Sequence, residues 1–174
     1  ATVAPSSVDN VITVRTGHTV SVNSNVAIDQ TVIDGTLQIL NGTLTVDNGT
    51  GTDLTVNSAT FFVGSEVVVT SGALVTSASS SLSYSGTTLV NNGTINMTVI
   101  MQGGPGAQNI NGTGVMNGLL MANNDGVVLG GDQTITGLLN YNNGNITTGN
   151  NKLIIATSAQ LTQNNSGTQW YVNG

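Results

Sequence analysis

Carboxylates are the side chains of this sequence that come closest to a catalytic set. A glycoside hydrolase needs two of them about 5 to 10 Å apart on one face of the protein, and either Asp29 with Asp34 or Asp34 with Asp53 has a spacing that allows this. However, Asp34 is followed by Gly35, and an aspartate beside Gly or Asn is typical of turns, where its side chain bonds the local backbone. We therefore expect these carboxylates to support turns, and catalysis is the weaker interpretation.

Basic residues are too few for the other catalytic sets. Besides His18, the sequence has only Arg15 and Lys152, near opposite ends of the chain, and its formal net charge is -6. A lyase site needs a basic residue beside acidic ligands, and a Ser-His-Asp triad built on His18 would lack a Gly-x-Ser-x-Gly pattern. A surface that binds nucleic acid needs clustered Lys and Arg. The sequence thus predicts neither an enzyme nor a nucleic-acid partner.

Calcium is the cofactor for which the sequence offers suitable oxygen ligands. One candidate set is Asp47, Asn48 and Asp53, and a second combines residues 123–126 with Asp132. Neither set matches an EF-hand loop or the calcium-binding nonapeptide repeat. The sequence has no cysteine, which excludes thiolate metal sites. We predict no cofactor and keep calcium as the alternative.

The elements that must position these residues are short β-strands. Apolar and polar residues alternate with period two in residues 11–14, 19–22, 36–39 and 43–46, as in half-buried strands. Gly, Asn or Asp interrupts most apolar stretches after three to five residues. No stretch approaches the roughly 20 apolar residues that cross a bilayer, so membrane insertion is not predicted.

An internal repeat indicates how the strands are arranged. Residues 44–50, 67–73 and 88–94 align and place Gly49, Gly72 and Gly93 at intervals of 23 and 21 residues. A unit of this length with two or three short strands is typical of one coil of a β-helix. The predicted fold is all-β, a right-handed parallel β-helix (β-solenoid) of six to seven coils of about 23 residues. A β-sandwich is the alternative, because Asn-Gly steps are also typical of hairpins.

The alignment makes a specific prediction about side chains. Val46, Val69 and Val90 each lie three residues before one of the aligned glycines. We expect these valines to form one inward-facing column and the glycines to occupy equivalent corners, because coils of a solenoid stack with equivalent positions above each other.

Segments at both ends of the solenoid resemble a known group of proteins. Residues 12–26 (ITVRTGHTVSVNSNV), 143–155 (NGNITTGNNKLII) and 170–174 (WYVNG) are similar to the large secreted adhesin-like β-helix proteins of gliding and polysaccharide-degrading bacteria. In those proteins such segments open and close solenoid regions of long cell-surface proteins, often exported with a separate C-terminal sorting domain. The resemblance implies an extracellular location, secreted or at the cell surface. It implies no catalytic or binding residues.

The two ends of the predicted solenoid are its candidate interaction sites. We divide the chain into residues 1–10, an N-terminal cap or docking segment, and residues 11–174, a single solenoid domain. An uncapped last coil leaves strand edges unpaired, and such edges recruit other chains. Its expected partner is a continuation of the same polypeptide or another copy of the chain. The residues expected at this end-to-end interface are Val3, Pro5, Trp170, Tyr171 and Val172.

The predicted function is that of a non-enzymatic extracellular structural or adhesive module, a stiff cell-surface stalk or fibre component. The main alternative is a self-assembling homopolymeric filament subunit joined end to end. A polysaccharide lyase or hydrolase is the third hypothesis. Surface polysaccharide is a further candidate partner.

Overall fold

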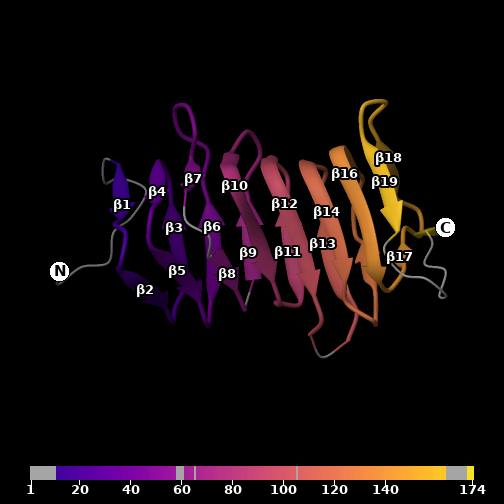
Figure 1. Ribbon diagram of the computed structural model, residues 1–174, viewed down its shortest axis with the longest axis horizontal. Coiled ribbons are helices and arrows are strands. Elements are labelled where there is room, and N and C mark those ends of the chain that lie inside the picture. The colour runs from indigo at the N-terminus through magenta and orange to yellow at the C-terminus, as the bar shows by residue number, and fades with distance from the viewer. Residues whose placement is uncertain (1–10, 58–60, 65, 105, 164–171) are drawn as a thin grey trace.

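The computed structural model describes residues 11–57, 61–64, 66–104, 106–163 and 172–174. These residues form twenty β-strands and no helix. The strands follow one another along the long axis of the molecule, from residues 12–14 at one end to residues 153–163 at the other (Figure 1). Among the described residues, no helix has the length and apolar character needed to cross a membrane.

The chain winds into coils with three faces, and the strands of each face pair in parallel with those of the neighbouring coils. The first face contains the short strands β1 (Ile12–Val14), β4 (Thr31–Ile33), β7 (Leu54–Val56) and β18 (Leu153–Ile155). The second face contains β2 (Thr19–Val22), β5 (Thr36–Ile39), β8 (Phe61–Val63) and β19 (Gln160–Gln163). Four long strands run through both faces: β10 (Leu74–Tyr84), β12 (Thr94–Gln102), β14 (Val115–Ala122) and β16 (Gln133–Asn143). These long strands join the two faces into one 12-stranded sheet.

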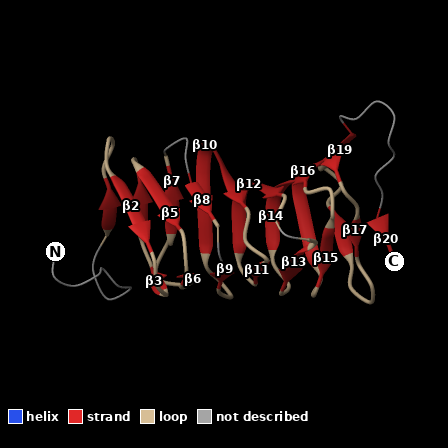
Figure 2. Cartoon of the chain, turned by 90° about the horizontal axis from the view of Figure 1, so that it is seen from below, coloured by secondary structure: helices blue, strands red, loops and turns tan. Residues whose placement is uncertain are grey.

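The third face is a separate 8-stranded sheet with one strand from each coil. It consists of β3 (Val26–Ile28), β6 (Thr43–Val46), β9 (Glu66–Val69), β11 (Thr88–Asn91), β13 (Gln108–Asn111), β15 (Val127–Leu129), β17 (Ile146–Thr147) and β20 (Val172–Asn173). In a view from below, the strands lie across the long axis, and the loops form the corners between them (Figure 2).

Strand register on the first face confirms the parallel β-solenoid and its number of coils. Successive coils align Ile12, Thr31, Leu54, Val75, Ile95, Met116, Ile135 and Ile155. The path through these eight residues makes seven turns, in agreement with the six to seven predicted. A turn takes 19 to 23 residues, and the longest is the one whose corner runs through residues 47–53.

The core consists of columns of aligned side chains. Each inner side chain is covered by the aligned side chains of the coils before and after it. On the second face the aligned residues are Val20, Leu37, Phe61, Leu82, Val99, Leu119, Leu139 and Leu161. The six inner members are buried, whereas Val20 is 42% exposed and Leu161 is 66% exposed. A coil buries its apolar face only against the next coil, so the first and last coils keep theirs open.

The predicted column on the third face is correct for two of its three valines. Val46 lies beside Val69, and both are buried. The next residue in this column is Asn91, so the prediction for Val90 is wrong. Val90 pairs with Val68 and is only half-buried, because a shift of one residue moves a side chain to the other side of a strand.

Asn91 is accommodated inside the solenoid because its side-chain NH2 group finds partners in later coils. The residue is completely buried. Its Nδ2 donates to Oε1 of Gln133 at 3.2 Å and to the carbonyl oxygen of Val115 at 3.3 Å, whereas its Oδ1 has no partner within the described residues. The two bonds offset part of the free energy lost when the amide is buried.

The three aligned glycines all lie in turns from the third face back to the first, as predicted. Gly49 and Gly72 each come three residues after the paired Val46 and Val69, whereas Gly93 comes two residues after Asn91, the next residue in that column. A Cβ atom on Gly49 would meet the side chain of Asp29, and one on Gly72 would meet that of Asn48. The glycines therefore occupy the same corner of successive coils, but their surroundings at that corner differ from coil to coil.

Candidate functional site

The corner formed by residues 47–53 holds a completely buried carboxylate, Asp53. Its Oδ1 accepts a hydrogen bond from the backbone N–H of Gly49 at 2.8 Å, and its Oδ2 accepts one from Leu74 at 2.6 Å. The first bond closes the long corner, and the second ties it to the next coil. Both oxygens thus support the backbone, as expected for an aspartate in a turn.

Asp29 is the carboxyl group that the structure brings next to Asp53. Burial raises the pKa of Asp29, and the neighbouring Asp53 raises it further. Asp34 lies at a different corner, beyond β4, where its Oδ1 accepts a hydrogen bond from Nδ2 of Asn57 at 2.9 Å. The structure therefore places Asp29 next to Asp53. This is neither of the two pairs predicted from the sequence.

The raised pKa of Asp29 predicts how stability depends on pH. Since the folded protein binds this proton up to a higher pH than the unfolded chain, whose pKa is near the ordinary 3.8, the free energy of unfolding falls as pH rises through the folded pKa. Asp29→Asn should therefore raise the melting temperature at neutral pH and flatten its pH dependence between acidic and neutral pH. Thermal melts at several pH values measure this. Asp34→Asn is the control, because it also removes one negative charge. An equal rise in melting temperature in both variants would contradict the raised pKa of Asp29.

In each candidate calcium set, a carboxylate is bonded to the backbone of the protein itself. In the first set, both oxygens of Asp53 are bonded to backbone N–H groups. In the second, β15 separates Asn123 from Asp132; the Asn123 side chain is buried and donates to the carbonyl oxygen of Gly106 at 3.0 Å. Oδ1 of Asp132 accepts a hydrogen bond from the N–H of Lys152 at 2.8 Å. Within the described ranges, no three His, Cys, Asp or Glu side chains converge.

The basic residues lie far apart, as their positions in the sequence suggested. Arg15 and His18 are exposed at the corner between β1 and β2, where Nδ1 of His18 is 3.3 Å from the carbonyl oxygen of Thr16. Lys152 is exposed at the opposite end, directly before β18. Arg15 and His18 lie at the corner between the first and second faces, whereas Asp29 and Asp53 lie at the corner between the third and first faces.

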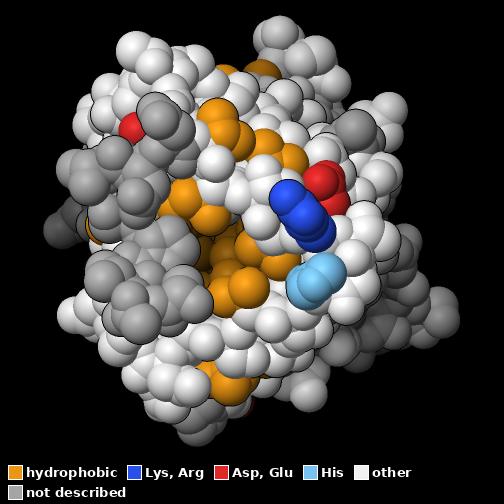
Figure 3. All heavy atoms as spheres, turned by 90° about the vertical axis from the view of Figure 1, so that its left-hand side faces the viewer, with side chains coloured by type: hydrophobic (Ala, Val, Ile, Leu, Met, Phe, Trp, Pro, Cys, Tyr) orange, Lys and Arg blue, Asp and Glu red, His pale blue; other side chains and the backbone are white. Residues whose placement is uncertain are grey.

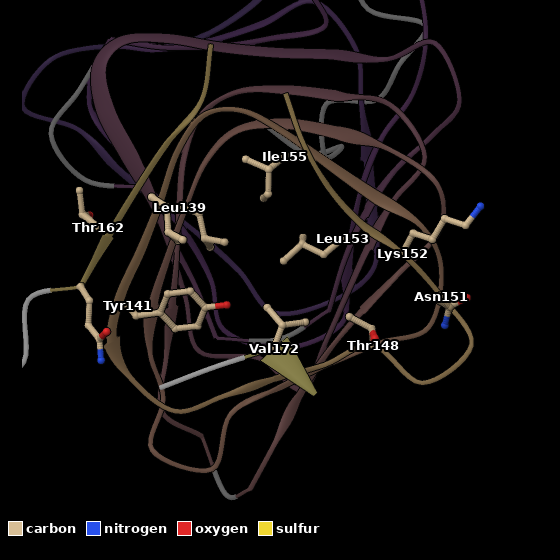
Figure 4. A pocket seen from close by; sticks show the side chains of 11 residues that line it. Leu139, Tyr141, Thr148, Asn151, Lys152, Leu153, Ile155, Thr162 and Val172 are labelled. Atoms are coloured by element: carbon tan, nitrogen blue, oxygen red, sulfur yellow. The ribbon is translucent and has the colours of Figure 1, made fainter. Parts of the chain in front are cut away.

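The C-terminal end of the solenoid is hollow. A cavity of about 810 Å³ opens there, between the last coil and the coil beneath it. Leu139, Leu153, Ile155 and Val172 point into it, whereas Lys152 points away (Figure 4). Leu161 also lines the cavity. The end is therefore an apolar surface with its charge at the rim.

The N-terminal end has the same character. Its cavity, of about 350 Å³, is lined by apolar residues of the first coil that include Ile12, Val14, Val20 and Val26. Seen from this end, hydrophobic side chains gather around a central hollow (Figure 3).

No protein-family model, curated protein or solved structure matches this chain. The fold and the chemistry of its own residues therefore carry the functional argument.

Tyr141 contributes an unpaired polar group to the C-terminal cavity. Its hydroxyl group is buried and has no hydrogen-bond partner in the described part of the chain, and it points toward the cavity (Figure 4). Burial raises the pKa of Tyr141 to about 12, so the phenol stays protonated. Tyr84 occupies the same column three coils earlier, and there the hydroxyl donates to the carbonyl oxygen of Thr88.

The end-to-end interface predicted from the sequence is only partly within the described residues. Val172 is 46% exposed and lines the C-terminal cavity. Val3, Pro5, Trp170 and Tyr171 lie outside the described residues, as does the segment 1–10.

Sequence reasoning missed the exposed apolar residues of the terminal coils. The structure adds Val20 at one end, and Ile155 and Leu161 at the other. In the sequence they resemble ordinary strand residues. The available signal was that they belong to the first and last repeats, whose apolar faces have a neighbouring coil on one side only.

Proposed function

We propose that this chain is a non-enzymatic structural or adhesive module that acts outside the cell, secreted or at its surface, as a stiff stalk or fibre component. The observation that carries the proposal is the continuous set of inner columns through seven turns of the solenoid. Each coil is fixed to its neighbours by strand pairing on three faces, which stiffens the stack against bending.

The outer surface supports a structural role because it is polar with few charges. Thr43 bonds Glu66 in the next coil at 3.1 Å, and Asn96 bonds Asn117 in the next coil at 3.2 Å. Such ladders add coil-to-coil contacts on the outside of the rod. Charged residues are 6% of the chain, so long-range attraction to charged partners is weak.

The carboxylates support the non-enzymatic part of the proposal. Asp53 uses both oxygens for backbone hydrogen bonds, and Asp34 accepts a hydrogen bond from Asn57. A catalytic pair would instead need an acid and a base free to face a substrate. For the adhesive role, surface polysaccharide is the ligand class that the resemblance to bacterial adhesins suggests.

A panel of acidic and neutral polysaccharides tests this function. The expected result is no release of reducing or unsaturated ends during prolonged incubation, with intact polysaccharide retained by the immobilised protein where the module is adhesive. Asp29→Asn and Asp34→Asn should leave both measurements unchanged. Reproducible cleavage that either substitution abolishes would contradict the non-enzymatic function, and heat-denatured protein controls for contaminating activity.

A further inference from the structure

We propose that the C-terminal end of this solenoid binds the N-terminal end of a second copy, so that the last coil of one molecule pairs with the first coil of the next. The inference rests on the proposed structural function and names the partner of its open C-terminal end. Its evidence lies in the register of the columns, the direction of the strands and the unpaired hydroxyl group of Tyr141.

The columns of one molecule continue into those of the next without a change of register. On the second face, the position that follows Leu161 is taken by Val20 of the next copy; on the first face, Ile12 follows Ile155. All four are apolar. Val20, Ile155 and Leu161 are exposed, so stacking gives each the neighbour that the inner members of its column already have.

Strand direction selects a head-to-tail arrangement. Every strand pair between described coils is parallel, and β18 and β19 each pair with β16 on one side only. A second copy translated and rotated along the axis presents β1 and β2 in the same direction, which preserves parallel pairing. Two C-terminal ends facing each other would reverse the winding direction and place the strands antiparallel. Contacts between unlike ends propagate into a filament unless they close into a ring.

Tyr141 is the second, independent observation at the C-terminal end. Only 5% of this residue is exposed, its hydroxyl group has no partner within the described ranges, and it lines an open cavity of about 810 Å³. An unpaired buried donor is destabilising. Tyr84, in the same column, donates to the carbonyl oxygen of Thr88 four residues later in its own coil, whereas the described residues offer Tyr141 no such partner. A second copy docked over the cavity would bring polar backbone groups to this end from outside the chain.

The size of the end predicts the strength of the contact. Strands of about four residues give each face a length of about 13 Å, so with corners and outer side chains two docked ends bury about 1,000 Å² in total. This lies near the lower limit for specific interfaces. We therefore expect assembly that depends on protein concentration.

Two charged substitutions, one at each end, test the proposal. Leu161→Asp blocks the C-terminal end and Val20→Asp blocks the N-terminal end; both side chains are exposed, so the fold should tolerate the changes. The two changes carry the same charge, so the two blocked ends also repel each other. Sedimentation velocity should show concentration-dependent polymers of the 174-residue chain. Each variant alone should be monomeric, because a charge buried without a partner weakens association about tenfold or more. Val128→Asp, on the outer side of β15 and 37% exposed, is the control and should still polymerise.

Mixing the two variants shows whether a C-terminal end binds an N-terminal end. Val20→Asp protein keeps a functional C-terminal end and Leu161→Asp protein keeps a functional N-terminal end, so an equimolar mixture should form dimers. These dimers should not grow further, because their outer ends both carry an aspartate. A chain that stays monomeric at high concentration would overturn the proposal, as would dimers of either variant alone. A monomeric chain that cleaves no polysaccharide would leave the proposed structural function standing, so the two proposals fail separately.

Discussion

Val99→Asp is expected to lower the free energy of unfolding by about 4 kcal/mol or more, because it places a charge without a partner inside the solenoid. Val99 is completely buried in the middle of its column, between Leu82 and Leu119, and both neighbours are apolar. Since coils are stabilised by the coils on either side, the damage should reach beyond one coil and separate the two halves of the stack. Urea and thermal denaturation followed by circular dichroism measure the loss.

The matched control for this substitution is the next residue of the same strand. Ile100 is half-buried and faces the other side of β12. Ile100→Asp introduces the same charge in the same strand with access to water, so its cost should be about 1 kcal/mol. Equal losses in the two variants would contradict the inward direction of Val99.

Gly144→Ala should be the most damaging glycine substitution at a corner, with an expected loss of about 3 kcal/mol or more. Gly144 has a φ of 77°, a conformation that side chains disfavour. A Cβ there would also overlap the carbonyl oxygen of Asn123 and lie 2.9 Å from Cα of Gly126, both in the preceding coil. Backbone atoms cannot move aside as a flexible side chain can, so the coils would have to separate locally.

Gly17 provides a control that separates the two causes. Its φ of 79° is nearly the same, but nothing lies within 4 Å of a Cβ built on it. Gly17→Ala should therefore cost only the strain of the left-handed backbone, about 1 to 2 kcal/mol. The difference between the two melting temperatures measures the close approach of coils, and no difference would show that the corners are looser than the structure indicates.

The fold could be predicted from the sequence because its signals are local and repeated. Alternating residues mark each strand, and Gly or Asn marks each corner. Register to a single residue was harder to predict. In Thr88–Asn91, both Leu89 and Val90 are apolar, and the choice between them depends on Asn91, whose partner Gln133 lies 42 residues further on. A buried polar pair of that separation leaves no local pattern.

The candidate sites depended even more on long-range geometry. The sequence identified Asp29 and Asp53 as candidates but paired each with Asp34, because the position of Asp53 is set by the long corner at residues 47–53. The unpaired hydroxyl group of Tyr141 was also beyond the sequence, since Tyr84 in the same column has a partner. The two tyrosines differ in whether the chain that follows supplies an acceptor, as the carbonyl oxygen of Thr88 does for Tyr84.

The strands lie across the long axis, so the hydrogen bonds between coils run along it (Figure 2). Tension applied between the two ends therefore pulls these bonds open one coil at a time, as in unzipping, instead of shearing many at once. Each coil that peels away exchanges a rise of about 4.8 Å for about 60 to 80 Å of extended chain. The same ladder that makes the rod resist bending thus makes it extensible under load, with a reserve of length that is released in steps and recovered when the coils rewind.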